Sequence, residues 1–449
     1  MYIPHTPAER DEMLKVVGKK SLEELFSNIP ERFRFPKLDL PEPVSEMEAE
    51  EQFADLANAN YAANQMISFL GAGVYNHYVP AAVDMLLRRG DFFTAYTPYQ
   101  PEISQGTLQA IFEYQSLIAN LTGMDVSNAS HYDGATASGE ACLSAYHHFR
   151  GKRPKIILSG AVHPHYRETI HTYLCGFDDI QIIEAGLADD PSYPTKLAGM
   201  VDDQTCLVLV QYPDFLGTVH DFSNLGKRIH ETGGLLAVSA NPIALGLFKP
   251  PSDFGADFVV GEGQPLGIPM NFGGPYLGFF ATRNELIRKI SGRLVGETVD
   301  QAGRRGYVLT LTAREQHIRR EKATSNICTN QGLMALAATV YMSLLGKHGL
   351  KEVANLCFQK AHYAAQIINK IPGFEVKSQA VFFNEFLVKC PKDPAAINEY
   401  MLDEGILGGL PLGEFYPDLK DHLLIAVTEK NTKESIELLA ELLEEAAND

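Results

Sequence analysis

Five apolar runs of strand length recur between residues 156 and 260, and polar or helical stretches lie between them. The runs occupy residues 156–158, 180–183, 207–210, 235–238 and 258–260. Apolar strands that alternate with helices are typical of βαβ units, which assemble into a buried and mostly parallel sheet. The alternation therefore predicts an α/β fold. Ligands of such sheets collect at the carboxyl ends of the strands, where this sequence places His163, Gln211, Ser239 and Gln264.

The pattern divides the chain into three parts. Residues 1–60 predict a helical arm of the kind that wraps a neighbour or caps a groove, and capping boxes begin at Thr6, Ser21 and Ser45. Residues 61–330 form the predicted large domain. Residues 331–449 predict a small α+β domain in the order helix, strand, strand, helix, strand, helix, with strands near 374–379, 381–388 and 423–427.

Composition excludes several classes of function. The chain has 449 residues and a formal net charge of −18, which argues against nucleic acid and anionic membrane surfaces as partners. It has no run of about 18 apolar residues, so we expect no transmembrane helix. Because no signal peptide is evident, we expect a cytoplasmic protein. Six scattered cysteines without a CxxC pair predict buried reduced thiols, and no metal site is expected.

Four polar segments are candidates for binding, and each has a plainer explanation. Residues 69–80 form either a hydrophobic hinge or part of a substrate cleft. Residues 96–106 are dense in hydrogen-bonding groups, although Ser104 would also cap the next helix. Residues 128–141 place small residues and hydroxyls at a helix start. These residues would either hold a phosphate or pack the helix tightly against the sheet. The charged residues 283–325 form a solvated or interface face, or an anion-binding wall.

Residues 257–269 resemble the strand and glycine-rich loop that present the Schiff-base lysine in aminotransferase-like pyridoxal phosphate (PLP) enzymes. Gln264 stands where that lysine is expected, and Ser239, 25 positions earlier, stands where an acidic residue is expected. A primary amide cannot form a Schiff base, because its nitrogen is not a nucleophilic amine. The resemblance therefore implies a vestigial cofactor pocket, whose residues are Ala135, Thr136, Ser138, His163, Ser239 and Gln264.

Five stretches in combination resemble one family. They are residues 97–106, 133–136, 261–267, 296–300 and 320–329. The chain is similar to the glycine cleavage system P-protein family, glycine dehydrogenase (decarboxylating), in organisms where that protein is split. It resembles the first, or alpha, subunit, which is the N-terminal half.

The resemblance implies a large domain of PLP fold type I and an oxidoreductase that decarboxylates glycine and releases carbon dioxide. It implies a second, beta, subunit that carries the lysine and binds PLP covalently, in an α2β2 tetramer. The aminomethyl group would pass to the lipoyl arm of the H-protein.

In this fold, loops at the strand ends of one half commonly complete the cleft of the other half. We therefore expect two loops of this chain to reach the partner's active site, with the residues Tyr99, Gln100, Glu102, Ser104, Thr324, Ser325 and Asn326. No catalytic residue is expected in this chain itself. Two alternatives stay open, which are a non-catalytic scaffold or regulatory subunit and a solitary PLP-dependent decarboxylase.

Overall fold

The computed structural model describes residues 5–63, 65–187, 191–271, 273–377 and 380–448. The chain forms two compact units, residues 1–61 and 62–449. The first contains α1 (Pro7–Val16), two 3₁₀ turns (Glu23–Phe26 and Glu31–Phe33) and α2 (Glu46–Asn58). The capping boxes predicted at Thr6 and Ser45 are confirmed. The one predicted at Ser21 is wrong, because the turn begins at Glu23 and no side chain caps it.

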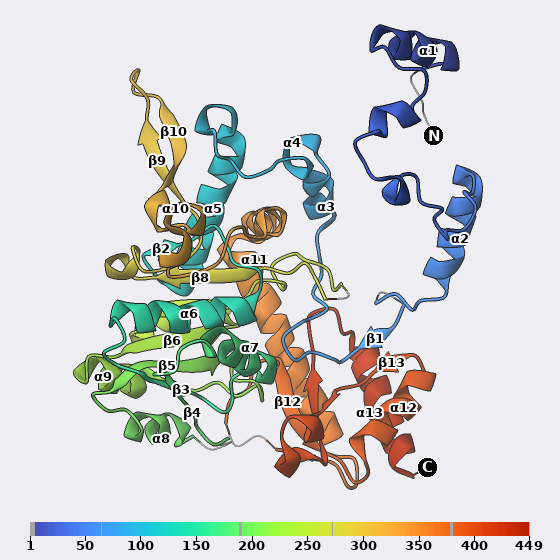
Figure 1. The fold of residues 1–449 in the computed structure, drawn as a ribbon. Helices are drawn as coiled ribbons and strands as arrows, with labels where there is room; N and C mark the ends of the chain where they lie inside the picture. Colours follow the sequence, from blue (N-terminus) through green and yellow to red (C-terminus); the bar gives the residue numbers. More distant parts are fainter. Residues whose placement is uncertain (1–4, 64, 188–190, 272, 378–379, 449) are drawn as a thin grey trace. The chain divides into compact units, whose positions relative to one another are not determined.

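The second unit is built around a seven-stranded sheet (Figure 1). Its order is β2-β8-β7-β6-β5-β3-β4, in which β3 to β7 are parallel and β2 and β8 are antiparallel to their neighbours. The strands are β2 (Val126–Ser127), β3 (Lys155–Leu158), β4 (Gln181–Glu184), β5 (Thr205–Tyr212), β6 (Leu235–Ala240), β7 (Phe258–Glu262) and β8 (Gly278–Thr282). All five runs in the sequence became parallel strands, so the prediction of a mostly parallel sheet is confirmed.

Successive side chains of the strands alternate between two hydrophobic cores, as the pleat of a strand requires. Leu207 and Leu209 of β5 pack on one face with α6 (Gly134–His148) and α7 (Pro164–Leu174). Val208 and Val210 pack on the other face with further helices, including α5 (Gln105–Thr122), α8 (Tyr193–Gly199) and α9 (Ser223–Glu231). Helices therefore cover both faces of the sheet.

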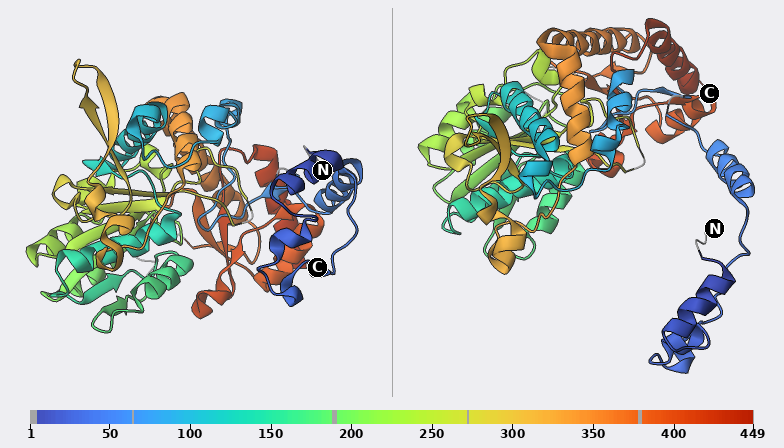
Figure 2. Two further views of the ribbon diagram at one scale, coloured as in Figure 1. Left: turned by 45° about the horizontal axis from the view of Figure 1, so that its top comes forward. Right: turned by 90° about the horizontal axis from the view of Figure 1, so that it is seen from above.

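Several smaller elements connect these layers. β1 (Ile67–Ser68), α3 (Ala81–Leu87) and α4 (Gly90–Phe93) precede α5. Gly123 ends α5 in the left-handed conformation, as predicted, whereas the side chain of Ser104 does not cap its start. After β8, β9 (Leu294–Val299) and β10 (Arg305–Thr310) form a hairpin that stands out from the unit (Figure 2). The short α10 (Gln316–Arg319) follows.

The C-terminal part has the predicted order of elements. Its elements are α11 (Gly332–Ile368), β11 (Glu375–Val376), β12 (Glu385–Lys389), α12 (Pro394–Asp403), β13 (Ile406–Leu407), β14 (Leu410–Pro411), β15 (His422–Ala426) and α13 (Lys433–Asn448). β13 and β14, two residues each, were not predicted, and residues 378–379 of the first expected strand lie outside the described residues. The domain boundary expected near residue 330 stays a prediction.

α11 is long and apolar enough to cross a membrane by length and composition alone. Core helices pass the same test, and α11 buries Ala338 against the large sheet and Ile368 in the C-terminal core. Its backbone is interrupted at Gly346, where φ is 58° and ψ is −174°. The packing on both cores is that of a core helix.

The contact between α9 and the loop before β7 gives a test of the packing. A Cβ at Gly226 would collide with the backbone carbonyl oxygen of Phe254, which cannot turn aside. We expect Gly226→Ala to lower the free energy of unfolding by about 1–3 kcal/mol, as overpacking does. Gly199→Ala on α8 meets open space and should be neutral or slightly stabilising. Urea denaturation measures both, and equal losses would contradict this packing.

Candidate functional site

The carboxyl ends of the parallel strands surround a small cavity. Its lining includes His163 after β3, Gln211 of β5, Ser239 of β6 and Glu262 of β7. The cavity measures about 30 Å³, which is room for about two water molecules. The structure therefore brings the predicted residues His163 and Ser239 together. Space for a pyridine ring is lacking, because another part of the chain fills the cleft.

A loop of the chain itself, residues 71–78, fills this cleft, and we call it the plug loop. Gln264, only 1% exposed, holds it through the backbone of Tyr75. The Gln264 side-chain amide donates to the Tyr75 carbonyl at 2.9 Å and to the Ile268 carbonyl at 2.8 Å, and its oxygen accepts from Tyr75 N at 3.0 Å. The residue in place of the lysine thus has a structural role, because its amide matches a backbone donor and acceptor.

Two further side chains hold the plug loop. Glu385 of β12 accepts from Ala72 N at 2.6 Å and from the Tyr75 hydroxyl at 2.7 Å. His163 Nε2 donates to the Ala72 carbonyl at 2.8 Å, and the His163 ring stacks on Tyr166. Burial lowers the pKa of His163 to about 4, so the imidazole is neutral at pH 7. These contacts hold Ala72 in the left-handed region, at φ 57°, where a residue with a Cβ is strained.

The start of α6 is satisfied by the chain's own carboxylates. Glu262 accepts from Gly134 N at 3.1 Å, Gln264 N at 2.9 Å and Leu277 N at 3.0 Å. Asp133 accepts from Thr136 N at 2.7 Å. Burial raises the pKa of Glu262 to about 8, although the three amide hydrogen bonds lower it. Two of the amides that could have bound a phosphate at this helix start, those of Gly134 and Thr136, are therefore already bonded.

PLP does not fit the cleft of this chain. The position predicted for the lysine holds Gln264, the plug-loop residues Gly73 and Tyr75 line the cavity, and Glu262 takes an amide at the α6 start. Ala135, Thr136 and Ser138 do not line the cavity, and the Ser138 hydroxyl donates back to the Gly134 carbonyl. The predicted pocket residues thus fall into two groups, and only His163, Ser239 and Gln264 face the cleft or the plug loop.

The predicted cross-subunit loops meet at Arg293, which is 5% exposed. Its guanidinium lies 5.9 Å from the Tyr99 ring centroid, and it donates to the Asn330 side chain at 3.0 Å and to the Cys328 carbonyl at 2.7 Å. Arg293 also lines a small pocket with Thr324 and Ser325. One buried cation, which lies 3.9 Å from the Glu315 carboxylate, therefore contacts both loops. The sequence did not single it out, because it lies within a charged segment.

A buried carboxyl lies beside the second loop. Glu140 of α6 accepts from the Ser325 hydroxyl at 2.7 Å and is also bonded by Ser291. His131 Nε2 contacts the Ser291 hydroxyl oxygen at 2.9 Å. Burial raises the pKa of Glu140 to about 7, although the serine hydrogen bonds lower it. A protonation equilibrium near neutral pH is thus coupled to residues that anchor the loop.

The other predicted loop residues differ in exposure. Tyr99 is 52% exposed, Gln100, Glu102 and Asn326 are exposed, and Ser104 is half-buried. Of the charged residues predicted between 283 and 325, Arg304 pairs with Asp300 at the hairpin tip, whereas Arg314 donates to the Gly292 carbonyl at 2.9 Å. A solvated charged face is therefore present, and Arg314 is part of the framework of the loop region.

Comparisons with known proteins place these features in context. A family model described as the glycine cleavage system P-protein matches residues 1–443. A protein of Thermomicrobium roseum named probable glycine dehydrogenase (decarboxylating) subunit 1 is 54% identical over 447 residues, covering 99% of each chain. A protein of the same name from Desulforamulus reducens is 51% identical over 440 residues, covering 98% of each.

Solved structures give the same picture of the fold. A crystal structure of an inhibitor-bound glycine decarboxylase (P-protein) has a TM-score of 0.89 and 42% identity, covering 99% of this chain and 100% of that one. A glutamate decarboxylase of Lactobacillus brevis has a TM-score of 0.69 at 14% identity, covering 96% and 97%. These likenesses confirm the predicted PLP fold type I architecture.

The plug loop predicts the result of restoring the missing amine. We expect Gln264→Lys to bind no PLP, because the plug loop still fills the cleft and Glu262 still occupies an α6 amide. The substitution should also lower the free energy of unfolding by roughly 1–3 kcal/mol for each buried Tyr75 group left unpaired. Borohydride reduction followed by mass spectrometry measures the adduct, with the unsubstituted chain as control. A stoichiometric adduct at position 264 would contradict this view of the cleft.

Glu140 predicts a pH dependence of stability. Its folded pKa of about 7 lies above its ordinary value of 4.5, so the stability it contributes is complete below pH 4.5 and is lost as the pH rises through 7. Relative to a Glu140→Gln variant, the wild-type chain should lose roughly 2–4 kcal/mol of unfolding free energy between about pH 5 and about pH 8. Glu441→Gln at an exposed position is the control. Parallel pH profiles for wild type and Glu140→Gln would contradict the prediction.

Proposed function

The chain belongs to the glycine cleavage system P-protein family, and from this membership we propose that it is the subunit that completes a reactive centre held by a second subunit. Together the two subunits would decarboxylate glycine, release carbon dioxide and transfer the aminomethyl group to the lipoyl arm of the H-protein. The observation that carries the proposal is the filled cleft, because a chain whose own pocket excludes PLP needs a partner that binds it.

The second subunit would carry the Schiff-base lysine and bind PLP covalently. When bound there, PLP supplies an electron sink for the carbanion left by decarboxylation. This chain would contribute positioning groups from the two loops that Arg293 holds. Tyr99, Glu102 and Asn326 have exposed side chains, so they are free to reach another chain. Their roles would be to orient the glycine carboxylate and to shape the entry for the lipoyl arm.

The N-terminal unit supports an intimate partner. Within 61 residues it exposes many large apolar side chains, among them Val16, Leu25, Phe26, Phe33, Phe35, Leu38, Leu40, Phe53, Leu56 and Tyr61. Among the described residues of this unit only Leu14 is buried, so it has almost no hydrophobic core of its own. Exposed apolar surface on this scale is typical of protein interfaces. We propose that this arm contacts the second subunit in an α2β2 assembly, and that the assembly works in the cytoplasm.

A non-catalytic scaffold is the alternative that the filled cleft also allows. The two proposals differ in whether side chains of this chain line the partner's active site. Arg293 favours the enzymatic role, because a buried cation that organises two polar loops is more than a scaffold needs. A solitary PLP-dependent decarboxylase has no support from the cleft.

Substitution of the exposed loop residues tests this proposal. We expect Tyr99→Phe, Glu102→Ala and Asn326→Ala each to lower kcat/KM of the assembled complex roughly tenfold to a hundredfold, because misplaced substrate slows the reaction. Glycine–bicarbonate exchange with the co-expressed second subunit measures the activity. Neither chain alone should be active.

The matched control is Glu441→Ala, an exposed residue on α13, which should leave the exchange rate unchanged. Size-exclusion chromatography of each variant with the second subunit separates failed assembly from failed chemistry. Unchanged kcat/KM in all three loop variants, with assembly intact, would favour the scaffold.

A further inference from the structure

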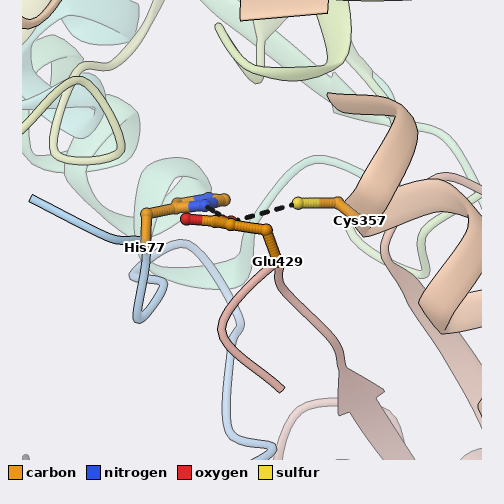
Figure 3. A group of neighbouring side chains, drawn as sticks. All are labelled: His77, Cys357 and Glu429. Atoms are coloured by element: carbon orange, nitrogen blue, oxygen red, sulfur yellow. Dashed lines mark hydrogen bonds and ion pairs between the residues drawn. The ribbon is translucent and has the colours of Figure 1, made fainter. Parts of the chain in front are cut away.

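Three side chains with metal-binding chemistry lie together away from the cleft cavity. His77 comes from the plug loop, Cys357 from α11 and Glu429 from the turn after β15 (Figure 3). One ligand atom from each residue lies within 4.8 Å of the other two. The three residues are 352 and 72 positions apart along the chain, so the tertiary fold alone brings them together.

The cluster is well shielded from solvent. The side chain of His77 is 2% exposed, that of Glu429 is 10% exposed and Cys357 is fully buried. His77 Nδ1 lies 2.7 Å from Glu429 Oε2, and the Cys357 thiol donates to the same oxygen at 3.3 Å. The Tyr78 amide donates to Glu429 Oε1 at 2.6 Å. The carboxylate is therefore fixed in orientation between a nitrogen and a sulfur ligand.

Two polar atoms beside this cluster lack hydrogen-bond partners within the described part of the chain. They are His77 Nε2 and the Tyr341 hydroxyl, each on a buried residue. Tyr341 lies within electrostatic reach of both Glu429 and Cys357. Buried polar atoms are nearly always bonded, so the unpaired Tyr341 hydroxyl indicates a missing partner beside Glu429 and Cys357. The His77 ring presents Nδ1, not Nε2, to Glu429.

We propose that His77, Cys357 and Glu429 bind a divalent transition metal of the zinc class. Nitrogen, thiolate and carboxylate oxygen are all ligands that Zn²⁺ accepts in tetrahedral sites. The cysteine disfavours Mg²⁺ and Ca²⁺, which take oxygen ligands. The fourth position would be taken by the Tyr341 oxygen or by a water molecule. This inference departs from the sequence prediction of no metal site, which considered only the spacing of the cysteines.

Binding has a defined proton balance. The metal replaces the proton of the Cys357 thiol, so one proton is released. The hydrogen bonds of Glu429 to the Cys357 thiol and to His77 are lost, and three metal–ligand bonds replace them. Ligand atoms around tetrahedral zinc lie roughly 3.3–3.7 Å apart, given its bond lengths. A contraction of about 1 Å from the largest separation is within the reach of side-chain rotation.

The position of the site suggests its role. The metal would join the plug loop to α11 and to the turn after β15, and so fix the end of the plug loop that Gln264 does not hold. Lys360 also donates to the Glu429 backbone carbonyl, which ties the same turn to α11. The site is therefore structural. It does not depend on the proposed function, because none of its residues belongs to the two cross-subunit loops.

Cobalt substitution tests the proposal on the full-length chain. After chelator treatment, Co²⁺ should bind at one equivalent and give a thiolate-to-cobalt charge-transfer band, which added Zn²⁺ abolishes. Cys357→Ser should lose the band and weaken binding at least about tenfold, as should His77→Gln in affinity. Cys175→Ser, at an exposed cysteine, is the matched control and should keep the band. Zn²⁺ should raise the unfolding midpoint of wild type and Cys175→Ser only.

Three results would overturn the proposal. They are no charge-transfer band in the wild-type chain, a band that survives Cys357→Ser, and a band that disappears in Cys175→Ser. Circular dichroism without metal checks that each variant folds. If Cys357→Ser does not fold, the wild-type titration and His77→Gln still decide the matter, because the band requires a thiolate ligand and the affinity requires the histidine.

Discussion

The pairing of one side-chain amide with one backbone segment is the interaction on which the cleft of this chain depends. Gln264 matches the donor and the acceptor of Tyr75 at distances of 3.0 and 2.9 Å. A lysine at this position could donate to the carbonyl but could not accept from the amide. Because a buried unpaired amide is costly, glutamine and the plug loop stabilise each other. The residue predicted to stand in place of the lysine is thus the residue that holds the plug loop.

The remaining polar groups at the edge of the sheet follow the same principle. Glu262 accepts hydrogen bonds from the amides of Gly134 in α6, Gln264 in its own turn and Leu277 just before β8. The amide of Gly134 is one that a bound phosphate could otherwise have used. Glu385 and His163 satisfy Ala72 from opposite sides. Buried polar groups need hydrogen-bond partners, and at this edge of the sheet the chain supplies several of them itself. A cleft satisfied in this way fits the proposal that a second subunit binds PLP.

Sequence patterns predicted the fold well and the site only in part. The alternation of Leu207, Val208 and Leu209 is visible as an apolar run and became β5 with its two buried faces. Chemistry alone excludes a Schiff base on the amide of Gln264, whereas the assignment of this position to the lysine site stays a prediction. The plug loop was not predictable, since residues 71–78 bond to partners up to 354 positions away. Arg293 and Glu140 were missed because the burial of a single charged side chain leaves no periodic signal in the sequence, whether it lies in a charged segment, as Arg293 does, or among small residues, as Glu140 does.

The interruption of α11 at Gly346 has a mechanical consequence. The segment after it is continuous helix to Ile368, and it carries Leu350 and Ala354 in the core of the large sheet and Ala361 and Ile368 in the C-terminal core. One continuous helical segment thus passes through both hydrophobic cores, and the interruption at Gly346 lies outside the stretch that links them. Because Gly346 precedes the segment that joins the two cores, bending of the helix at this interruption would leave the arrangement of the two cores unchanged.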